Sequence, residues 1–158
     1  MATLPLPTTF MLVAGAAEGP SRLNAFDNAL LEAGIGDLNL VKISSVLPAG
    51  AYETAHLNVA PGALVPTAYG AVESQVPGEM IAAAVAIALP ADGKSGVIFE
   101  YSGRTNAEDA EAAVRRMAEA AFERRGRPLR EVRSRSVEHR VVQMGCAIAA
   151  VALGFEAP

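Results

Sequence analysis

Any fold of this chain must bury a long, nearly uncharged run that extends from Val141 to Phe155. A helix needs about 20 apolar residues to cross a bilayer, and this run is shorter. We therefore expect no membrane contact and place the run in the core of a globular protein. Hydrophobic residues make up 51% of the 158 positions and charged residues 19%, which is typical of a single folded domain covering residues 1–158.

Composition also argues against several kinds of partner and site. The net charge of -4 disfavours nucleic-acid binding. Nine of the thirteen basic residues lie between Arg115 and Arg140, but glutamates alternate with them, so we expect a solvated, ion-paired face. Because Cys146 is the only cysteine and His56 and His139 are the only histidines, we expect no disulfide and no metal site. No basic residue precedes the first apolar stretch, which favours a cytoplasmic protein.

A short helix is predicted after a first strand, Thr9 to Gly15, and a turn rich in small residues. Asn24 is a suitable N-cap for this helix, and Gly34 is a suitable stop. The spacing of its apolar residues predicts one stripe that faces a core. That stripe consists of Leu23, Phe26, Leu30 and Leu31.

The middle of the chain favours strands. An alternating segment from Leu38 to Val46 ends before Pro48, which places Ser44 and Ser45 at a strand end. The Ala-rich runs 62–73 and 80–89 suit buried helices and buried strands alike, but the prolines and glycines around them favour short strands. In the strand 96–102, Glu100 shares a face with Ile98.

The clearest element is a helix from Thr105 to Arg125. A capping box of Thr105 and Glu108 opens it, and Gly126 closes it. Its buried row is predicted to be Ala110, Val114, Met117 and Ala121. Two further segments, 129–137 and 144–155, complete an α+β chain.

The chain has no common nucleophile or nucleotide signature. The segment from Gly34 to Pro48, which contains the serine pair, resembles the self-processing segment of the pyruvoyl-dependent arginine decarboxylases. The resemblance extends from about Phe10 to Phe155, because further segments also match in the same order. These are LNAFDNALL from Leu23, GALVPTAYG from Gly62, IFEY from Ile98, VEH from Val137 and GCA from Gly145.

The resemblance implies that Ser45 attacks the carbonyl of Ser44 and that the chain cleaves itself between them. Residues 1–44 would become a β chain, and residues 45–158 an α chain that begins with a pyruvoyl group derived from Ser45. The ketone of that group binds the substrate amine and accepts electrons as CO2 leaves, so neither a metal nor pyridoxal phosphate is required. The implied fold is a four-layer αββα sandwich. The implied assembly is a homotrimer, or a multiple of it, with active sites between subunits.

Two polar residues acquire catalytic roles from the resemblance. Asn39 is expected near the scissile carbonyl, where its amide would stabilise an oxyanion; the alternative is an ordinary turn asparagine. Glu100 is expected to protonate the α-carbon after CO2 has left. An acid with this role must keep its proton near neutral pH, so burial beside Ile98 should raise its pKa above about 4.3. The alternative is an exposed glutamate at a strand end.

Asp27 is the expected reader of the substrate side chain. Helical spacing sets it within or beside the apolar stripe, near Leu23 and Leu30, where an unpaired charge is costly. The resemblance implies that Asp27 binds the guanidinium group and that Leu23 and Leu30 line the site. The alternatives are a carboxylate that complements the helix dipole or one that pairs with Arg22.

The resemblance therefore implies that the substrate is arginine and that the products are agmatine and CO2. Two other readings stay open: a pyruvoyl decarboxylase of another amino acid, such as aspartate or histidine, and an unprocessed relative without catalysis. His139 is expected to be a structural histidine that bridges buried groups, and His56 is given no role.

Overall fold

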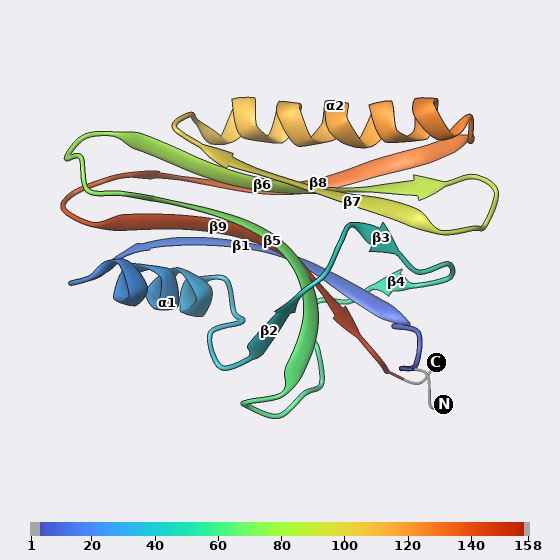
Figure 1. The fold of residues 1–158 in the computed structure, drawn as a ribbon, viewed down its shortest axis with the longest axis horizontal. Helices are drawn as coiled ribbons and strands as arrows, with labels where there is room; N and C mark the ends of the chain where they lie inside the picture. The colour runs from blue at the N-terminus through green and yellow to red at the C-terminus, as the bar shows by residue number, and fades with distance from the viewer. Residues whose placement is uncertain (1–3, 157–158) are drawn as a thin grey trace.

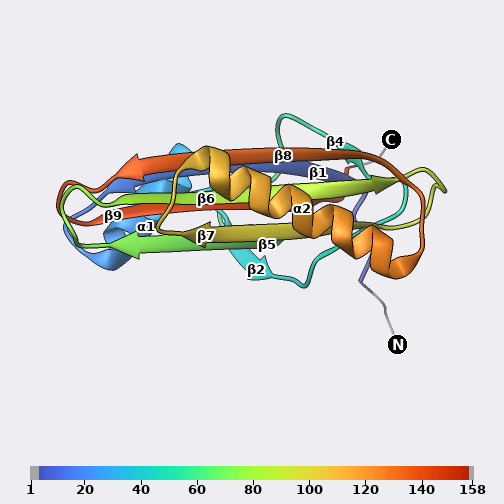
Figure 2. The ribbon, with the colours of Figure 1, turned by 90° about the horizontal axis from the view of Figure 1, so that it is seen from above.

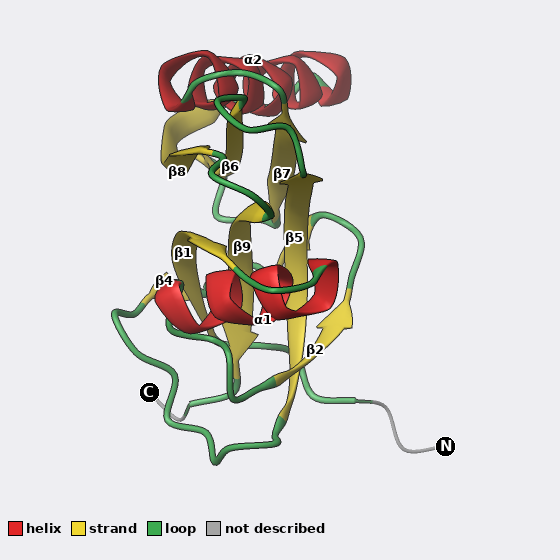
Figure 3. Cartoon of the chain, turned by 90° about the vertical axis from the view of Figure 1, so that its left-hand side faces the viewer, coloured by secondary structure: helices red, strands yellow, loops and turns green. Residues whose placement is uncertain are grey.

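The computed structural model describes residues 4–156 and contains two β-sheets stacked face to face (Figure 1). One helix covers the outer face of each sheet, and the side view shows the four layers in order (Figure 3). Buried residues from both sheets form the central apolar layer between them. The expected αββα sandwich is confirmed.

The first sheet has the strand order β2-β5-β9-β1-β4. Its three central strands are antiparallel, and the two short edge strands pair in parallel with their neighbours. The bounds are β1 Thr9–Glu18, β2 Asn39–Lys42, β4 Tyr52–Glu53, β5 Leu64–Ser74 and β9 Gly145–Gly154.

The second sheet has the order β3-β7-β6-β8 and is antiparallel throughout. Helix α2 lies across its outer face (Figure 2). The bounds are β3 Val46–Leu47, β6 Met80–Pro90, β7 Gly96–Gly103 and β8 Leu129–Arg140.

The Ala-rich runs are strands, and they are longer than the short strands predicted. The run 62–73 is β5 and the run 80–89 is β6, and each strand has 11 residues. Two Ala-rich strands are almost completely buried, namely β6 and the C-terminal β9, which has 10 residues. Both are buried on two faces, because each is a central strand of a sheet that packs against a helix on one side and against the other sheet on the other. This double burial explains why neither run alternates with polar residues. No helix in the described part of the chain is long and apolar enough to cross a membrane.

Helix α1, Arg22–Glu32, corrects the prediction in two ways. Its N-cap is Ser21, whose hydroxyl accepts the N–H of Asn24, so the helix begins two residues before the predicted cap. Its buried face consists of Ala25, Ala29 and Leu30, whereas Leu23 is 75% exposed and Leu31 is 50% exposed. The predicted stripe is therefore wrong for Leu23 and Leu31.

Small residues explain which face of α1 is buried. A Cβ atom added to Gly15 of β1 would lie 2.5 Å from the carbonyl oxygen of Ala29 and from the backbone nitrogen of Ala33. The helix thus approaches the sheet backbone closely along its alanine side. The larger leucines at 23 and 31 do not fit into that contact and point outward.

Helix α2, Ala107–Arg125, agrees more closely with its prediction. Its N-cap is Asn106, whose side-chain oxygen accepts the N–H of Asp109, so the predicted Thr105 cap is wrong by one residue. Gly126 ends the helix with φ of 61°, as expected. Met117 is 37% exposed and not in the buried row. The buried residues are Ala110, Val114, Ala118, Ala121 and Phe122.

The strand predicted from Leu38 to Val46 is interrupted. β2 ends at Lys42 in the first sheet, and β3 begins at Val46 in the second sheet. The three residues between them carry the chain from one sheet to the other. Ser44 and Ser45 therefore lie in a crossover between the two layers, not at the end of one continuous strand.

Candidate active site

The backbone around the serine pair is held on both sides of the crossover. The N–H of Ile43 donates to the Thr67 carbonyl of β5 at 3.2 Å, and the Ser45 carbonyl accepts the N–H of Ile98 of β7 at 2.9 Å. Ser44 is exposed and Ser45 is half-buried. The segment thus presents the bond between the serines at an accessible position while its flanking residues are fixed.

The carbonyl of Ser44 has a donor from its own turn. The N–H of Val46 donates to the Ser44 carbonyl oxygen at 3.1 Å, so the chain makes a three-residue turn with Ser45 at its centre. An N–H that points at this oxygen would also stabilise negative charge developing there. This contact was not predicted, since a backbone donor leaves no signature in the residue types.

Glu100 lies between the two sheets and close to the crossover. Its neighbours in β7 alternate as predicted: Ile98 packs in the layer between the sheets, whereas Phe99 and Tyr101 pack toward α2. Ser45 is hydrogen-bonded to Ile98, and residues two apart on a strand face the same side about 7 Å apart. Glu100 is therefore two positions along β7 from the residue that is hydrogen-bonded to Ser45, on the same face of the strand as Ile98.

The carboxyl of Glu100 is poorly solvated. Its Oε2 is buried, with no hydrogen-bond partner among the described residues. Burial raises the pKa of Glu100, while the positive charge of Lys42 and the residue's own backbone N–H oppose that rise. The predicted direction of the pKa shift and the predicted burial beside Ile98 are both confirmed.

Asp27 lies elsewhere in the molecule. It is exposed on α1, and Leu23, four residues before it, is exposed with it, whereas Leu30 faces the sheet. The expectation that Asp27 is a costly charge among buried leucines is wrong, because the helix buries its alanine side. Arg22 does not supply its partner: the Nε atom of Arg22 donates to Glu73 at 2.6 Å.

Asn39 lies at the start of β2, outside the crossover that contains the serine pair. Its side-chain nitrogen donates to the Gly62 carbonyl at 2.8 Å. Ser44 lies five positions after Asn39, and β2 is extended from Asn39 to Lys42, so the two residues can be up to about 16 Å apart. Within one chain, the Asn39 amide thus contacts the Gly62 carbonyl and not the Ser44 carbonyl.

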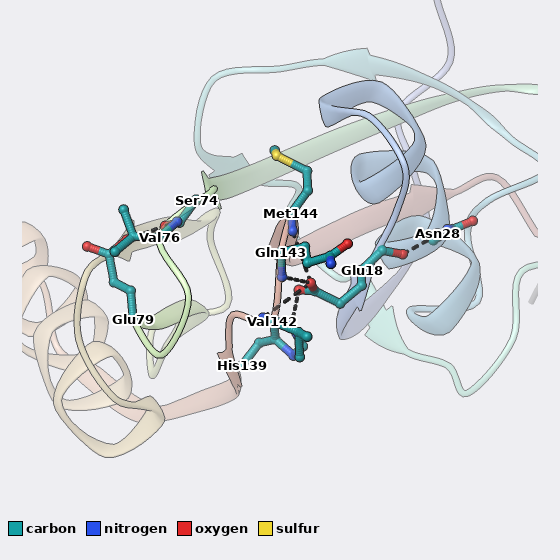
Figure 4. Close-up of polar contacts among 9 residues, drawn as sticks. All are labelled: Glu18, Asn28, Ser74, Val76, Glu79, His139, Val142, Gln143 and Met144. Carbon is teal, nitrogen blue, oxygen red and sulfur yellow. Dashed lines mark hydrogen bonds and ion pairs between the residues drawn. The ribbon is translucent and has the colours of Figure 1, made fainter.

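His139 contacts one partly exposed carboxylate, which differs from the predicted bridge between buried groups. Its Nε2 lies 2.6 Å from Oε2 of Glu18, while Oε1 of Glu18 accepts the N–H groups of Val142, Gln143 and Met144 at 2.6–3.2 Å (Figure 4). Partial burial alone would raise the pKa of Glu18, but these hydrogen bonds lower it. The carboxylate ties the end of β1 to the turn between β8 and β9.

The predicted ion-paired face is present only in part, on β8 and the segment before it, where Arg127, Arg130 and Arg133 form ion pairs. Arg133 contacts both Glu53 and Glu131, at 2.8 and 2.7 Å, and Arg127 contacts Asp92 at 3.0 Å. Among residues 4–156, no group of three or more His, Cys, Asp or Glu side chains could hold a metal ion. Among the described residues, the polar groups of the site are serine hydroxyls, backbone N–H groups and the carboxyl of Glu100.

The comparisons with known proteins agree with this arrangement. The sequence model of the family named pyruvoyl-dependent arginine decarboxylase matches residues 9–158. The chain is 51% identical over 153 residues to the enzyme of that name from Methanocaldococcus jannaschii, covering 96% of this chain and 92% of the relative. It is 44% identical over 151 residues to that of Pyrococcus abyssi, covering 94% and 96%.

A solved structure supports the fold. A pyruvoyl-dependent histidine decarboxylase matches with a TM-score of 0.53 and 20% sequence identity, over 66% of this chain and 56% of that one. This structural similarity concerns the fold alone, whereas the sequence matches extend over nearly the whole chain. This protein belongs to the pyruvoyl-dependent arginine decarboxylase family.

Proposed function

We propose that the chain cleaves itself between Ser44 and Ser45 and then decarboxylates L-arginine to agmatine and CO2. Membership of the family supports the arginine activity and a covalently bound pyruvoyl group. The observation that supports the position of the cut is the sheet-to-sheet crossover, where a serine pair is accessible and its flanking residues are hydrogen-bonded to two different sheets.

Self-cleavage begins with the Ser45 hydroxyl. Its Oγ attacks the carbonyl carbon of Ser44, the bond from that carbon to the Ser45 nitrogen breaks, and the nitrogen takes up a proton, which leaves an ester. The N–H of Val46 stabilises the oxyanion of this step. β-Elimination then releases residues 1–44 as a carboxylate, and water converts the remaining dehydroalanine to pyruvoyl with loss of ammonia.

The surroundings of Ser45 fit a pyruvoyl group. The position is half-buried, and a buried, unpartnered carboxyl oxygen belongs to a strand hydrogen-bonded to it. The group supplies an electron sink for the bond that joins the substrate α-carbon to its carboxylate. Glu100 holds a proton for the α-carbon, because burial favours its neutral form at a pH where an exposed glutamate is ionised.

Asp27 binds the guanidinium of arginine, and we propose that it does so across a subunit interface. Helix α1 lies on the outer face of the first sheet, whereas Glu100 lies on the inner side of that sheet. A helix with its side chains is about 10 Å thick, so one arginine cannot contact both residues of the same chain. A homotrimer, or a multiple of it, would bring Asp27 and Asn39 of one protomer to Ser45 and Glu100 of another.

Exposed apolar side chains on α1, β2 and β5 support the assembly. Leu23 on α1, Val41 on β2 and Leu64 on β5 are 75%, 46% and 73% exposed. These three side chains would be covered if α1, β2 and β5 lie in a subunit interface. In this assembly Leu23 would line the substrate site. Leu30 packs in the core between α1 and the first sheet.

The arginine activity and the role of Glu100 are tested together with purified, fully cleaved protein. Wild type should release CO2 and agmatine in equal amounts from arginine, and Glu100→Gln should lower turnover by about 10² or more. Glu119→Gln, at an exposed position on α2, is the matched control and should leave turnover unchanged. Near-normal CO2 release from Glu100→Gln would remove Glu100 from the mechanism.

A further inference from the structure

We propose that Gly70 of β5 and Ser102 of β7 are positioning residues for Glu100. This pair holds the Glu100 side chain in the layer between the sheets, where one carboxyl oxygen is buried without a hydrogen-bond partner among the described residues. The inference rests on the proposed role of Glu100 as the acid. It assigns the buried position of Glu100 to two residues, Gly70 and Ser102.

Gly70 provides the space. A Cβ atom added to Gly70 would lie 3.2 Å from Cγ and 3.3 Å from Cβ of Glu100. These contacts are tighter than nine in ten real Cβ contacts, so Glu100 would have to shift by a few tenths of an ångström to admit a side chain at position 70. Glycine at position 70 thus lets the Glu100 side chain pack directly against the backbone of β5.

The backbone does not require glycine at this position. Gly70 is absent from the glycines with positive φ, and it lies within the regular antiparallel pairing of β5 with β9. Glycine inside a strand is unfavourable, because it loses more conformational entropy and packs no side chain. The close approach of Glu100 is the feature of the structure that explains a glycine here.

Ser102 fixes the spacing of the two strands at the same point. Its Oγ donates to the Ala71 carbonyl at 3.0 Å, which links β7 to β5. Ser102 also lies 3.6 Å from the position of the added Cβ on Gly70. The hydrogen bond thus lies immediately beside the place where Glu100 passes between the strands.

Across the second sheet, Glu100 is in register with Val85 of β6 and, one strand further, with Arg135 of β8. Ile98 is the adjacent residue on the same face of β7. The charge that acts on Glu100 is that of Lys42 on β2, whose Nζ lies 4.5 Å above the ring of Tyr69, next to Gly70. Loss of burial would leave Lys42 unopposed and favour the ionised carboxylate.

The test measures turnover of arginine against pH for Gly70→Ala and for Ser102→Ala, in protein shown by mass spectrometry to be fully cleaved. An acid must be protonated to act, so a lower pKa moves the alkaline fall in kcat to lower pH. We expect this shift in both variants, and a loss of kcat of about tenfold or more in Gly70→Ala. Val72→Ile adds one carbon two residues along the same strand and should leave the fall in place.

Combination with Glu100→Gln separates positioning from general damage. If Gly70 acts through Glu100, Gly70→Ala should cause no further loss in the Glu100→Gln background. An equal fold-loss in both backgrounds, or an unchanged pH profile in Gly70→Ala, would overturn the proposal. If Gly70→Ala does not fold, an unmoved alkaline fall in Ser102→Ala overturns it instead. Full activity of Glu100→Gln alone would show that the acid role itself is wrong.

Discussion

Replacing Glu100 by Met should make the protein more stable while it destroys turnover. The two side chains have similar length, but Met has no oxygen to leave unpaired. The buried Oε2 of Glu100 has no partner among the described residues, and an unsatisfied buried polar group costs about 1–3 kcal/mol. We therefore expect a gain of about 1–3 kcal/mol in the free energy of unfolding, or about 2–4 °C in Tm for each kcal/mol in a chain of this size.

The gain should depend on pH with a definite sign. Burial raises the pKa of Glu100 in the folded state, so the folded protein binds more protons than the unfolded chain between the two pKa values. The stability of the protein with Glu100 is fully present below the unfolded value of about 4.3 and decreases as pH rises through the folded pKa. The advantage of Glu100→Met should therefore be larger at pH 8 than at pH 5.

Denaturant unfolding measures this effect in an unbroken chain. Both proteins should carry Ser45→Ala, so that no cleavage occurs, and should be compared at equal concentration because assembly also changes stability. Glu119→Met, at an exposed site on α2, controls for the change of residue type. Equal or lower stability of Glu100→Met at pH 8, or a gain that is the same at both pH values, would refute the burial argument.

Three further variants test other parts of the account. Asp27→Asn should weaken apparent arginine affinity while self-cleavage stays complete, and equal arginine kinetics would place the specificity determinant elsewhere. Glu18→Gln should cost about 2–3 kcal/mol of folding free energy. Because the pKa of Glu18 is lowered, its contribution to stability is present above about pH 4.3 and is lost as pH falls through the folded pKa. Unfolding experiments at pH 7 and at pH 3 would show this loss. Lys42→Met should raise the pKa of Glu100 and move the alkaline fall in kcat to higher pH, whereas Lys42→Arg should not.

The sequence predicts the elements whose signals are local. The alternation in 96–102 correctly places Glu100 on the face of Ile98, and Gly126 correctly ends α2. These predictions hold because strand alternation and a left-handed helix end depend on a few neighbouring residues. The predicted N-caps differ from the observed ones by three residues in α1 and by one in α2. Several adjacent side chains can accept the same kind of hydrogen bond, so the sequence locates a cap only approximately.

The missed features depend on contacts between distant segments. The buried side of α1 is its alanine side because Gly15 admits it to the sheet backbone, and apolar spacing within the helix cannot reveal that contact. The crossover at Ser44 and Ser45 requires two sheets, so the pattern of one segment predicts a continuous strand. The donor to the Ser44 carbonyl is the backbone N–H of Val46, and amino-acid types alone do not predict such a backbone contact.

Intact mass measurement of freshly purified protein tests the self-cleavage at the centre of this account. Wild type should convert, without any added factor, into one fragment of residues 1–44 and one of residues 45–158 whose first residue is a pyruvoyl group and resists N-terminal sequencing. Ser45→Ala should keep the mass of the full chain, because it lacks the attacking hydroxyl. A wild-type chain that stays whole after prolonged incubation, or a Ser45→Ala variant that still splits at this bond, would contradict the account.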